Sequence, residues 1–454
     1  MADAIPARPD PPPASDRTLR LAAAAIAVGL AALAFALRDL IAPRVQAVFG
    51  IVAFISFVAA FSKNLRAVNW RTVGSGMALQ LALALFILKF EIAGVRPGYE
   101  LFSRIADMVK RFLEFTNLGS QFVFRVLADP AAMEKVFGPG NGFIFAFTAL
   151  PTIIFVSSFF TVLYYFGVLQ FIVRLFARAM MLLMGTSGAE TLSAAANVFM
   201  GQTEAPIIVK PYVPSMTQSE LLALMVGGLA TISGGVMAVY IALGADPVAI
   251  LTTSVMAAPC GLYLSKIIYP ETEEPATRGE VKIVVERQHA NAIDAASAGA
   301  SDGMILAINV AAMLIAFLAF IAMFDYLLSL VSPGLSLSRI FGWVFSPVVV
   351  LMGVPAQDVA AMGDLLGTKL VGNEFLAYVK LTSEYKGVIS DRSFTLATYA
   401  LTGFANFASI GIQLGGIGGM APTRRSDLAR HGMRALLAGF LATMINACIA
   451  AALL

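Results

Sequence analysis

The sequence predicts an all-α integral membrane protein in which two short helical hairpins enter the membrane without crossing it. Of the 454 residues, 59% are hydrophobic and 13% are charged. Soluble globular proteins carry about 25% charged residues. Apolar segments of about twenty residues recur along the chain, which is the length that a helix needs to cross the hydrocarbon core. Two further apolar segments are interrupted by polar residues. These observations exclude a soluble fold, because too little polar surface would be left to face water.

The N-terminal third is predicted to hold a tail, three spans and an interfacial helix. Residues 1–20 are rich in proline, alanine and aspartate, which is typical of a disordered tail and not of a signal peptide. Three apolar segments follow that are each long enough to span: 21–41, 45–62 and 72–94. Within 98–128, apolar residues recur at steps of three and four, and charged residues fill the opposite face. That pattern predicts an amphipathic helix lying in the membrane interface.

Further spans follow on both sides of a hydrophilic segment. Residues 142–184 are apolar, with a break expected at Pro151. Segment 269–302 carries most of its charge as acidic residues and is predicted to be an extramembrane linker. The remaining apolar spans lie near 217–243, 247–268, 303–331, 393–417 and 433–454.

Two regions break this regular pattern of spans. Residues 186–213 are interrupted by Asn197 and by the polar segment 201–206, and residues 357–381 are interrupted at 372–375. Each half is too short to cross the membrane. Irregular backbone at membrane depth is tolerated only where protein buries it or where it lines a watery cavity. Each region is therefore predicted to be a re-entrant hairpin.

A helix interrupted by polar residues and glycine follows each hairpin, at 231–235 and at 406–411. Hairpin and interrupted helix thus occur twice, and such paired segments indicate a transporter with a binding site between two repeats. Glu204 and Glu374 lie at the two hairpin tips. Because a buried carboxylate is costly, each is expected to face a cavity, a partner or a ligand. The alternative is a salt bridge of Glu204 with Lys210 and of Glu374 with Lys369.

Other classes of protein find less support in the sequence. The net charge of +3 is too small for nucleic-acid binding. Neither His289 nor His431 has a metal-ligand neighbour at helical spacing, and Cys260 and Cys448 are expected to be inert buried thiols. An intramembrane enzyme that uses Glu204 and Glu374 remains an alternative, although no Gly-x-Gly-Asp, His-Glu-x-x-His or Gly-x-Ser-x-Gly motif is present.

Three long motifs resemble the concentrative nucleoside transporter family. The first is Gly-Gln-Thr-Glu-Ala-Pro-Ile-Ile-Val-Lys-Pro at 201–211, followed by Met-Thr-Gln-Ser-Glu at 216–220 and Gly-Gly-Leu-Ala-Thr-Ile-Ser-Gly-Gly at 227–235. The second is Val-Gly-Asn-Glu-Phe-Leu-Ala-Tyr at 371–378, and the third is Ala-Thr-Tyr-Ala-Leu-Thr-Gly-Phe-Ala-Asn-Phe-Ala-Ser-Ile-Gly-Ile at 397–412. The resemblance covers residues 40–454 in order and spacing.

This resemblance implies a bacterial-type transporter of about eight transmembrane helices, with the two re-entrant hairpins in an inverted repeat. It also implies a homotrimer in the bacterial inner membrane, a scaffold domain, and a transport domain that moves like an elevator. The implied activity is cation-driven nucleoside uptake. The corresponding boundaries are a tail (1–20), scaffold and interfacial helices (21–184), a first transport repeat (185–268), the linker (269–302), a scaffold and an interfacial helix (303–350), and a second transport repeat (351–454).

The family's nucleoside site can be carried over to matching residues. The resemblance assigns four residues to the nucleobase: Gln202, Thr203, Glu204 and Val236. It assigns three residues to the ribose: Glu374, Asn406 and Ser409. Amide, hydroxyl and carboxylate groups suit the donors and acceptors of a base edge and of sugar hydroxyls. A hydrogen bond between packed helices is the alternative role for Asn406 and Ser409. The preference between pyrimidine and purine stays open.

The coupling ion implied by the resemblance is Na⁺, and no organic cofactor is expected. Its ligands would be the side-chain oxygens of Asn197 and Thr231 and the backbone carbonyls of Met200 and Ile232. A hard cation prefers such oxygen ligands, and unwound helix ends supply them. Proton coupling through Glu204 or Glu374 is the alternative, because a partly desolvated carboxylate titrates nearer neutrality.

Overall fold

The computed structural model describes residues 14–138, 142, 144–278 and 289–454. Within these ranges the regular elements are helices, and the only β-type contact is an isolated bridge between Ile92 and Val95. Eight described segments are long and apolar enough to cross a membrane: Asp16–Ala36, Pro43–Ala60, Trp70–Leu88, Phe145–Tyr165, Gln218–Ala242, Pro247–Ile268, Ala292–Val331 and Pro422–Leu453. The prediction of an all-α membrane protein is confirmed.

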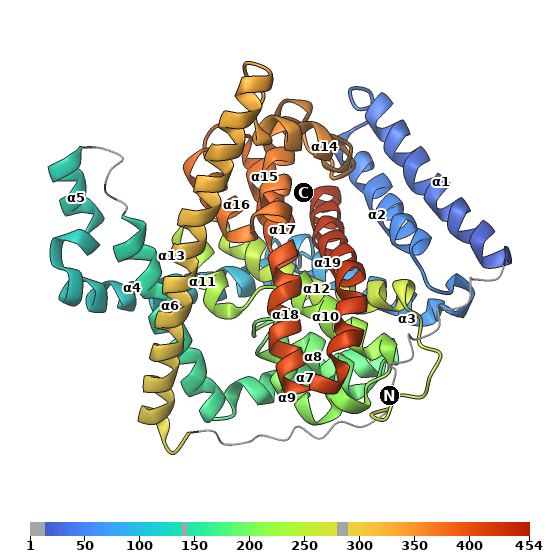
Figure 1. Cartoon of the computed structure of the whole chain (residues 1–454), viewed down its shortest axis with the longest axis horizontal. Coiled ribbons are helices and arrows are strands. Elements are labelled where there is room, and N and C mark those ends of the chain that lie inside the picture. The colour runs from blue at the N-terminus through green and yellow to red at the C-terminus, as the bar shows by residue number, and fades with distance from the viewer. Residues whose placement is uncertain (1–13, 139–141, 143, 279–288) are drawn as a thin grey trace, which may run out of the picture.

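The outer part of the molecule is formed by the first seven helices and by two later ones (Figure 1). They are α1 (Ala14–Ala36), α2 (Pro43–Ala60), α3 (Trp70–Leu88), α4 (Pro97–Phe124), α5 (Pro130–Phe137), α6 (Phe145–Tyr165), α7 (Val168–Met184), α13 (Ala292–Val331) and α14 (Leu337–Leu351). Short 3₁₀ turns η1 (Leu65–Ala67) and η2 (Arg125–Ala128) join some of them.

The inner part contains the segments that were predicted to form hairpins and interrupted helices. They are α8 (Gly188–Ala196), α9 (Ala205–Ile208), η3 (Lys210–Ser215), α10 (Gln218–Ala230), α11 (Gly234–Ala242), α12 (Pro247–Ile268), η4 (Ala356–Asp358), α15 (Val359–Val371), α16 (Glu374–Ser383), α17 (Asp391–Leu401), α18 (Phe407–Met420), η5 (Pro422–Arg424) and α19 (Arg425–Leu453). Helices α10, α12 and α19 pack on one another at the centre.

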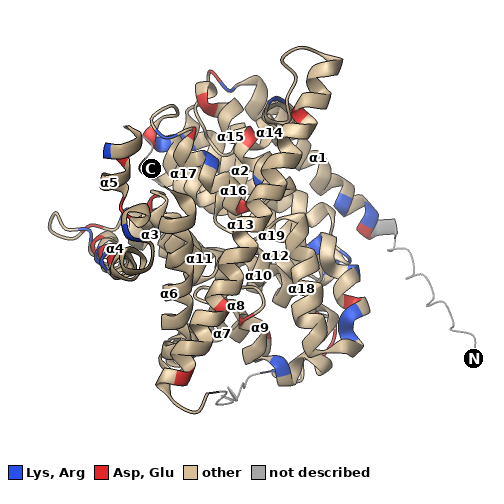
Figure 2. Cartoon of the chain, turned by 60° about the vertical axis from the view of Figure 1, so that its left-hand side comes forward, with Lys and Arg blue, Asp and Glu red and all other residues tan. Residues whose placement is uncertain are grey.

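Burial separates the two parts sharply. In the most apolar stretch of each inner span, 83% of the residues are buried, compared with 6% in α13 and 17% in α1. A helix that is apolar on all sides is found in a large core or in lipid. Lysine, arginine and the acidic residues lie mainly at helix ends and along α4, with few near the centre (Figure 2). The exposed apolar helices are thus placed to face lipid or another subunit.

Helix α13 spans 40 residues, which corresponds to about 60 Å at the rise of an α-helix. It lies along α6, as Figure 1 shows. Gly299 and Gly303 allow the close approach. A Cβ atom added at Gly299 would lie 2.5 Å from Thr161 Oγ1, and one at Gly303 would lie 2.7 Å from Ile154 Cα. These glycines hold α13 against α6 at the edge of the inner part.

The predicted disordered tail is wrong for residues 14–20, and residues 1–13 lie outside the described ranges. Helix α1 already begins at Ala14, and its first turns are anchored to the next part of the chain. The buried carboxylate of Asp16 accepts a hydrogen bond from Leu65 N at 2.8 Å, and Arg20 Nε donates to Ala60 O at 3.0 Å. These tertiary bonds order a segment whose composition favours disorder.

Two other predicted boundaries also differ from the structure. Helix α6 continues through Pro151, and the chain turns instead at Gly167, where φ is 77°. Membrane helices tolerate the loss of the single backbone hydrogen bond that proline removes. A residue in the left-handed backbone conformation, in contrast, ends a helix. The end of the predicted linker 269–302 is helical, because Asn291 caps α13 at Ala292. Residues 279–288 of that linker lie outside the described ranges.

Two short helices followed by a broken helix occur twice in the described part of the chain, and the segments of α8 with α9 and of α15 with α16 are called the first and the second hairpin below. Helices α8 and α9 precede the broken pair α10 and α11, and helices α15 and α16 precede the broken pair α17 and α18. Figure 1 places α8 and α9 toward one end of the molecule and α15 and α16 toward the other. The two breaks meet, because Phe404 N donates to Thr231 O at 3.1 Å. Gly403, with a φ of 146°, permits this contact, since an added Cβ would lie 3.0 Å from Ala230 O.

Candidate functional site

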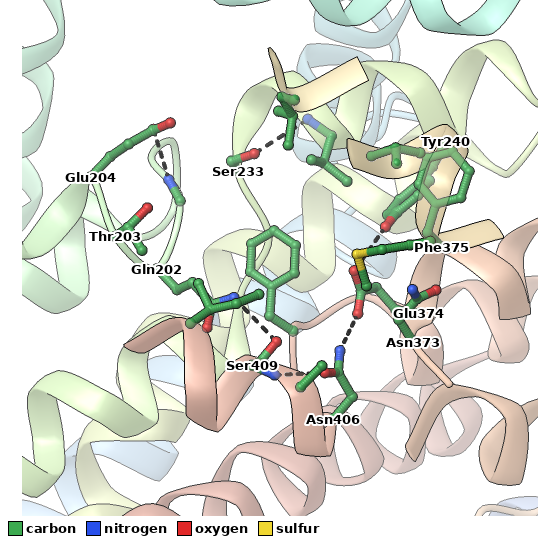
Figure 3. A pocket seen from close by; sticks show the side chains of 18 of the residues that line it. Gln202, Thr203, Glu204, Ser233, Tyr240, Asn373, Glu374, Phe375, Asn406 and Ser409 are labelled. Atoms are coloured by element: carbon green, nitrogen blue, oxygen red, sulfur yellow. Dashed lines mark hydrogen bonds between the residues drawn. The ribbon is translucent and has the colours of Figure 1, made fainter. Parts of the chain in front are cut away.

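A cavity of about 200 Å³ lies where the hairpin tips, α11 and the start of α18 meet α13 (Figure 3). All seven residues predicted to contact a nucleoside line it: Gln202, Thr203, Glu204, Val236, Glu374, Asn406 and Ser409. They come from both halves of the chain and are separated by up to 207 positions in sequence. The structure therefore brings the two predicted groups of residues into one site.

Glu374 is held at the start of α16 by bonds to both of its carboxylate oxygens. Asn373 caps this helix, because its side chain accepts from Leu376 N at 2.8 Å. The N-terminal end of a helix favours a negative group. Asn406 Nδ2 donates to Glu374 Oε2 at 2.7 Å, and the Tyr240 hydroxyl donates to Oε1 at 3.3 Å. The carboxylate is thus fixed in orientation and is 5% exposed.

Asn406 and Ser409 are positioned by the break between α17 and α18. Asn406 Oδ1 accepts from Ser409 N at 2.9 Å and caps α18, which turns its amide nitrogen toward Glu374. Ser409 Oγ accepts from Gln202 Nε2 at 3.1 Å. Gln202 Oε1 is buried and has no hydrogen-bond partner in the described part of the chain. This oxygen is free to accept a bond from a ligand.

The tip of the first hairpin carries Glu204 and Thr203. Glu204 Oε2 accepts from Gly201 N at 3.0 Å, and its side chain is the more exposed of the two tip carboxylates. Thr203 lies against Gly416 of α18, where an added Cβ would be 2.8 Å from Thr203 Cγ2. The first hairpin tip therefore packs directly on the second half of the chain.

The salt bridges considered for the tip carboxylates are absent from the described residues. Neither Glu204 nor Glu374 has a lysine nitrogen within 4.0 Å there. Instead, Lys380 pairs with Asp364 at 2.5 Å inside the second hairpin. Both tip carboxylates are left to face the cavity.

The opposite wall of the cavity is apolar. It is formed by Val236 of α11, Phe375, Phe404 and side chains of α13 that include Leu306 and Val310. Faces of planar rings bury well against such side chains, while ring edges and sugar hydroxyls need polar partners. The site thus suits a small ligand with one flat apolar part and one polyhydroxyl part.

A candidate cation site lies around Asn197, next to the first hairpin tip. Its side chain is fully buried, and neither its amide oxygen nor its amide nitrogen has a hydrogen-bond partner in the described part of the chain. It lies against Gly227, where an added Cβ would be 3.0 Å from Asn197 Nδ2. Gly227 O accepts from the Thr231 hydroxyl at 2.8 Å. The two predicted side-chain ligands thus flank the same turn of α10.

The backbone around this site is held by the contact between hairpin and break. Gly234 N donates to Phe199 O at 2.9 Å, which brings the segment with Met200 beside the segment with Ile232. An amide oxygen without a donor, a hydroxyl and backbone carbonyls are the ligands that a hard cation takes in a helix break. The residues present therefore fit Na⁺.

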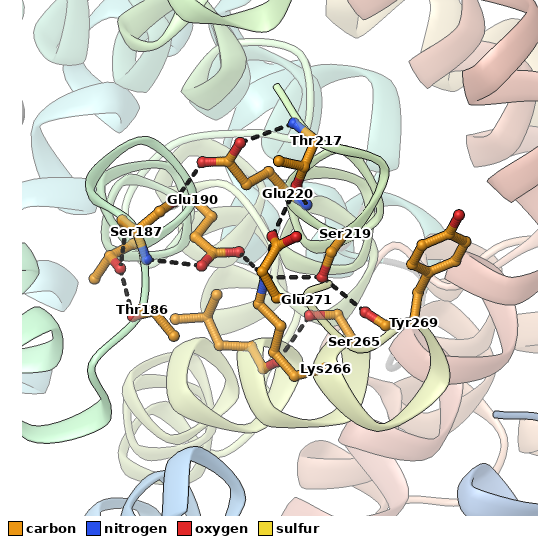
Figure 4. A network of polar contacts seen from close by, with 12 residues as sticks. Thr186, Ser187, Glu190, Thr217, Ser219, Glu220, Ser265, Lys266, Tyr269 and Glu271 are labelled. Atoms are coloured by element: carbon orange, nitrogen blue, oxygen red, sulfur yellow. Dashed lines mark hydrogen bonds and ion pairs between the residues drawn. The ribbon is translucent and has the colours of Figure 1, made fainter. Parts of the chain in front are cut away.

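A buried polar network on the far side of α8 was not predicted (Figure 4). Lys266 Nζ lies 2.6 Å from Glu190 Oε2 and 3.5 Å from Glu271 Oε2. The Ser187 hydroxyl donates to Glu220 Oε1 at 2.5 Å. Glu190 and Glu220 are each the third residue of a helix and close capping boxes with Ser187 and Thr217. The Ser/Thr-x-x-Glu spacing is the signal that could have revealed both carboxylates.

Tyr240 is a further site residue that sequence reasoning missed. It follows Val236 by four positions on α11, so the two side chains share a helix face. Its ring stacks on Tyr378 with centroids 4.0 Å apart, and its hydroxyl reaches Glu374. The spacing of four residues from Val236 is the sequence signal that could have identified Tyr240 as a site residue.

Comparison with known proteins places the chain among membrane transporters. Three family descriptions match in succession: "Na+ dependent nucleoside transporter N-terminus" at residues 49–127, "Nucleoside recognition" at 146–247, and "Na+ dependent nucleoside transporter C-terminus" at 249–451. The chain is 41% identical over 415 residues to a protein of Haemophilus influenzae described as an uncharacterized transporter, covering 89% of this chain and 96% of that protein.

Animal relatives and solved structures agree with these matches. Sodium/nucleoside cotransporter 1 of Mus musculus is 42% identical over 421 residues, which cover 88% of this chain. This chain spans 62% of the length of that cotransporter. The structure of CNTnw in an inward-facing substrate-bound state matches with a TM-score of 0.85 and 38% identity, covering 90% of this chain and 97% of CNTnw.

The fold and these matches together define a multi-pass membrane protein of a transporter family. The chain belongs to the Na⁺-dependent nucleoside transporter family, the concentrative nucleoside transporters. The family resemblance predicted from the three motifs is confirmed. The family and its members are transporters, so the alternative of an intramembrane enzyme is excluded.

Proposed function

We propose that this chain imports nucleosides by symport with Na⁺. The observation that carries the proposal is the single cavity in which Gln202 and Glu204 of the first half face Glu374 and Asn406 of the second half. A ligand that satisfies both groups must carry a flat ring with a hydrogen-bonding edge at one end and hydroxyl groups at the other end. A nucleoside has this chemistry, and the Mus musculus relative is named a sodium/nucleoside cotransporter.

Within this cavity the nucleobase lies at the first hairpin tip and the ribose lies at the second half. Gln202, Thr203 and Glu204 offer an amide, a hydroxyl and a carboxylate to the base edge, and Val236 supports its face. Glu374 accepts from ribose hydroxyls, and Asn406 and Ser409 complete the sugar site. Before the ligand enters, Gln202 and Ser409 bond to each other. The entering ligand replaces this bond by its own contacts, which lowers the cost of opening the site.

Sodium binds before the nucleoside and orders the first hairpin. Its ligands are Asn197, Thr231 and the carbonyls of Met200 and Ile232. Because the tip beyond Met200 carries Gln202 and Glu204, a cation that fixes this segment also fixes the base site. Each ligand then raises the affinity for the other by the same factor. That reciprocity couples the sodium gradient to uptake.

Movement across the membrane is by an elevator displacement of the inner helices within a homotrimer in the bacterial inner membrane. The two hairpins are re-entrant, and together with the broken helices they form an inverted repeat that moves as one unit. Three features support this proposal: the buried inner helices, the exposed α13, and the apolar wall that Leu306 and Val310 of α13 present to the cavity. Because this wall is apolar, it forms no hydrogen bonds with the bound ligand. The inner helices and their ligand can therefore move past α13 without breaking hydrogen bonds.

Labelled-uridine uptake into proteoliposomes tests this function. An inward sodium gradient without a proton gradient should drive accumulation above equilibrium. Asn197→Leu should abolish the sodium dependence, and Asp294→Asn, which changes an exposed carboxylate at the start of α13, should not. Uptake that persists without sodium and collapses with the proton gradient would replace Na⁺ by H⁺ as the coupling ion. Absence of uridine, cytidine and adenosine uptake under both gradients would refute nucleoside import.

A further inference from the structure

Lys369 is a fully buried cation that the proposed transport chemistry does not use. It lies in the last turn of α15, in the second hairpin. Its ammonium donates to Ala400 O at 2.7 Å and to the Thr443 hydroxyl at 2.9 Å, and it lies 5.5 Å from the ring centre of Phe440. No carboxylate in the described part of the chain lies within 4.0 Å of it.

The position of Ala400 explains why an unpaired ammonium is tolerated there. Helix α17 ends at Leu401, inside the molecule, so its last carbonyls lack partners within the helix. These carbonyls carry the negative end of the helix dipole. An ammonium that donates to Ala400 O satisfies one carbonyl and offsets that partial charge. Lys369 therefore acts as a cation bound at the end of a broken helix.

The first half of the chain has a matching broken-helix end. The Thr231 hydroxyl follows α10 and donates to Gly227 O, four residues back, at 2.8 Å. The Thr402 hydroxyl follows α17 and donates to Thr398 O, also four residues back, at 2.7 Å. In both halves the first helix of the hairpin packs on this broken helix, α8 on α10 and α15 on α17. The two ends are thus built alike.

What faces these two ends differs. The end of α10 is faced by Asn197, whose buried amide has no partner in the described part of the chain. The end of α17 is faced by the Lys369 ammonium, which donates to Ala400 O and to the Thr443 hydroxyl. The first half offers oxygen ligands to a cation that binds reversibly, whereas the second half carries its positive charge on the side chain of Lys369.

We propose that Lys369 is a tethered counterpart of the coupling cation, which keeps the second broken helix permanently in its cation-bound form. The second half, with the sugar-binding Asn406 and Glu374, then needs no mobile ion to become ordered. Only the first half responds to sodium, and a single mobile cation suffices to prepare the site. Lys369 is a positioning residue, since it acts through α17 and the break and does not line the cavity. This inference rests on the proposed sodium-coupled function.

The wild-type protein supplies the first test. Uridine binding to the purified protein in nanodiscs is measured as sodium is raised at constant ionic strength. The inference predicts a hyperbolic sodium response with a Hill coefficient near one. A sigmoidal response with a coefficient near two overturns it, because two mobile cations would then be required. A flat response instead refutes the proposed sodium coupling, so the two failures are distinguishable.

Two substitutions supply the second test. Lys369→Met removes the charge and should weaken uridine binding at saturating sodium by about tenfold or more, because the end of α17 loses its cation. Lys369→Asn recreates the amide of the first half and should make the sodium response sigmoidal at higher sodium concentrations. The inference is wrong if Lys369→Met binds uridine as the wild type does, or if Lys369→Asn folds and stays hyperbolic.

Lys380→Met is the matched control. Lys380 belongs to the other arm of the same hairpin and pairs with Asp364, so its loss destabilises the hairpin without touching α17. Its sodium response should stay hyperbolic, which separates a general loss of stability from loss of the tethered charge. If neither Lys369 variant is monodisperse after purification, the wild-type sodium response decides the question.

Discussion

Replacing Glu374 by glutamine tests the sugar site with little change in shape. Glutamine can still accept from Asn406 Nδ2 through its amide oxygen. Its amide nitrogen can donate to the Tyr240 hydroxyl, so that this hydroxyl becomes the acceptor instead of the donor. The bonds that hold the side chain, at 2.7 and 3.3 Å, are therefore retained in number. What is lost is the negative charge that is proposed to accept hydrogen bonds from the ribose hydroxyls.

The expected magnitude follows from this single difference. A hydrogen bond to a charged group contributes about 1.5–3 kcal/mol. Loss of one such bond should weaken uridine binding by about 10- to 150-fold. Sodium affinity measured without nucleoside should stay unchanged, because Asn197 and Thr231 belong to the other half of the chain.

The assay compares uridine with 2′-deoxyuridine and 3′-deoxyuridine in the wild type and in Glu374→Gln. In the wild type, the deoxy analogue that lacks the contacted hydroxyl should bind more weakly than uridine. In the variant this difference should shrink, since both changes remove the same interaction and their effects are not additive. Glu271→Gln, in the network at the far side of α8, is the control and should keep the wild-type ratio. Unchanged uridine affinity, or an undiminished difference between uridine and its analogues, would refute the sugar assignment.

Three further outcomes follow from the same contacts. Asn197→Ala should lower sodium affinity about tenfold or more, by removing one of few oxygen ligands, as measured by the sodium dependence of uridine binding. Tyr240→Phe removes a neutral donor to Glu374 and should weaken uridine binding by up to about tenfold with unchanged sodium dependence; a larger loss than that of Glu374→Gln would contradict the geometry. Lys266→Met should destabilise the protein by about 3–5 kcal/mol, because Glu190 stays buried without its partner, and thermal unfolding would show a lower Tm; an unchanged Tm would contradict this.

The sequence predicted the fold class and the gathering of site residues, because both depend on strong local signals. Runs of about twenty apolar residues leave few alternatives to a membrane helix. Likewise, a carboxylate such as Glu204 or Glu374 amid apolar residues needs a special environment. The long motifs around these residues added the site assignments.

What the sequence did not reveal depends on contacts between distant parts of the chain. The helical start of α1 relies on Asp16 meeting Leu65, and composition alone favours disorder there. The helix through Pro151 survives because one lost bond is tolerated in an apolar environment. Lys266 pairs with Glu190, 76 positions away in a helix that neighbours it only in space. No periodicity or residue spacing in the sequence indicates such pairs.

The contact between the two broken helices places the proposed cation site directly against the segment that carries the proposed sugar ligands. The Thr231 hydroxyl is one of the proposed cation ligands, and the Thr231 backbone carbonyl accepts from Phe404 N. Phe404 lines the cavity proposed to bind the nucleoside, and the Phe404 carbonyl accepts from Asn406 N at 2.9 Å. Asn406 in turn holds Glu374. Since the Lys369 ammonium already holds the end of α17, a cation that fixes the backbone at Thr231 would dock the first half onto a sugar segment that is already ordered. The element shared by ion and nucleoside is then the first hairpin, and coupling is reciprocal because each ligand lowers the cost of ordering that hairpin for the other.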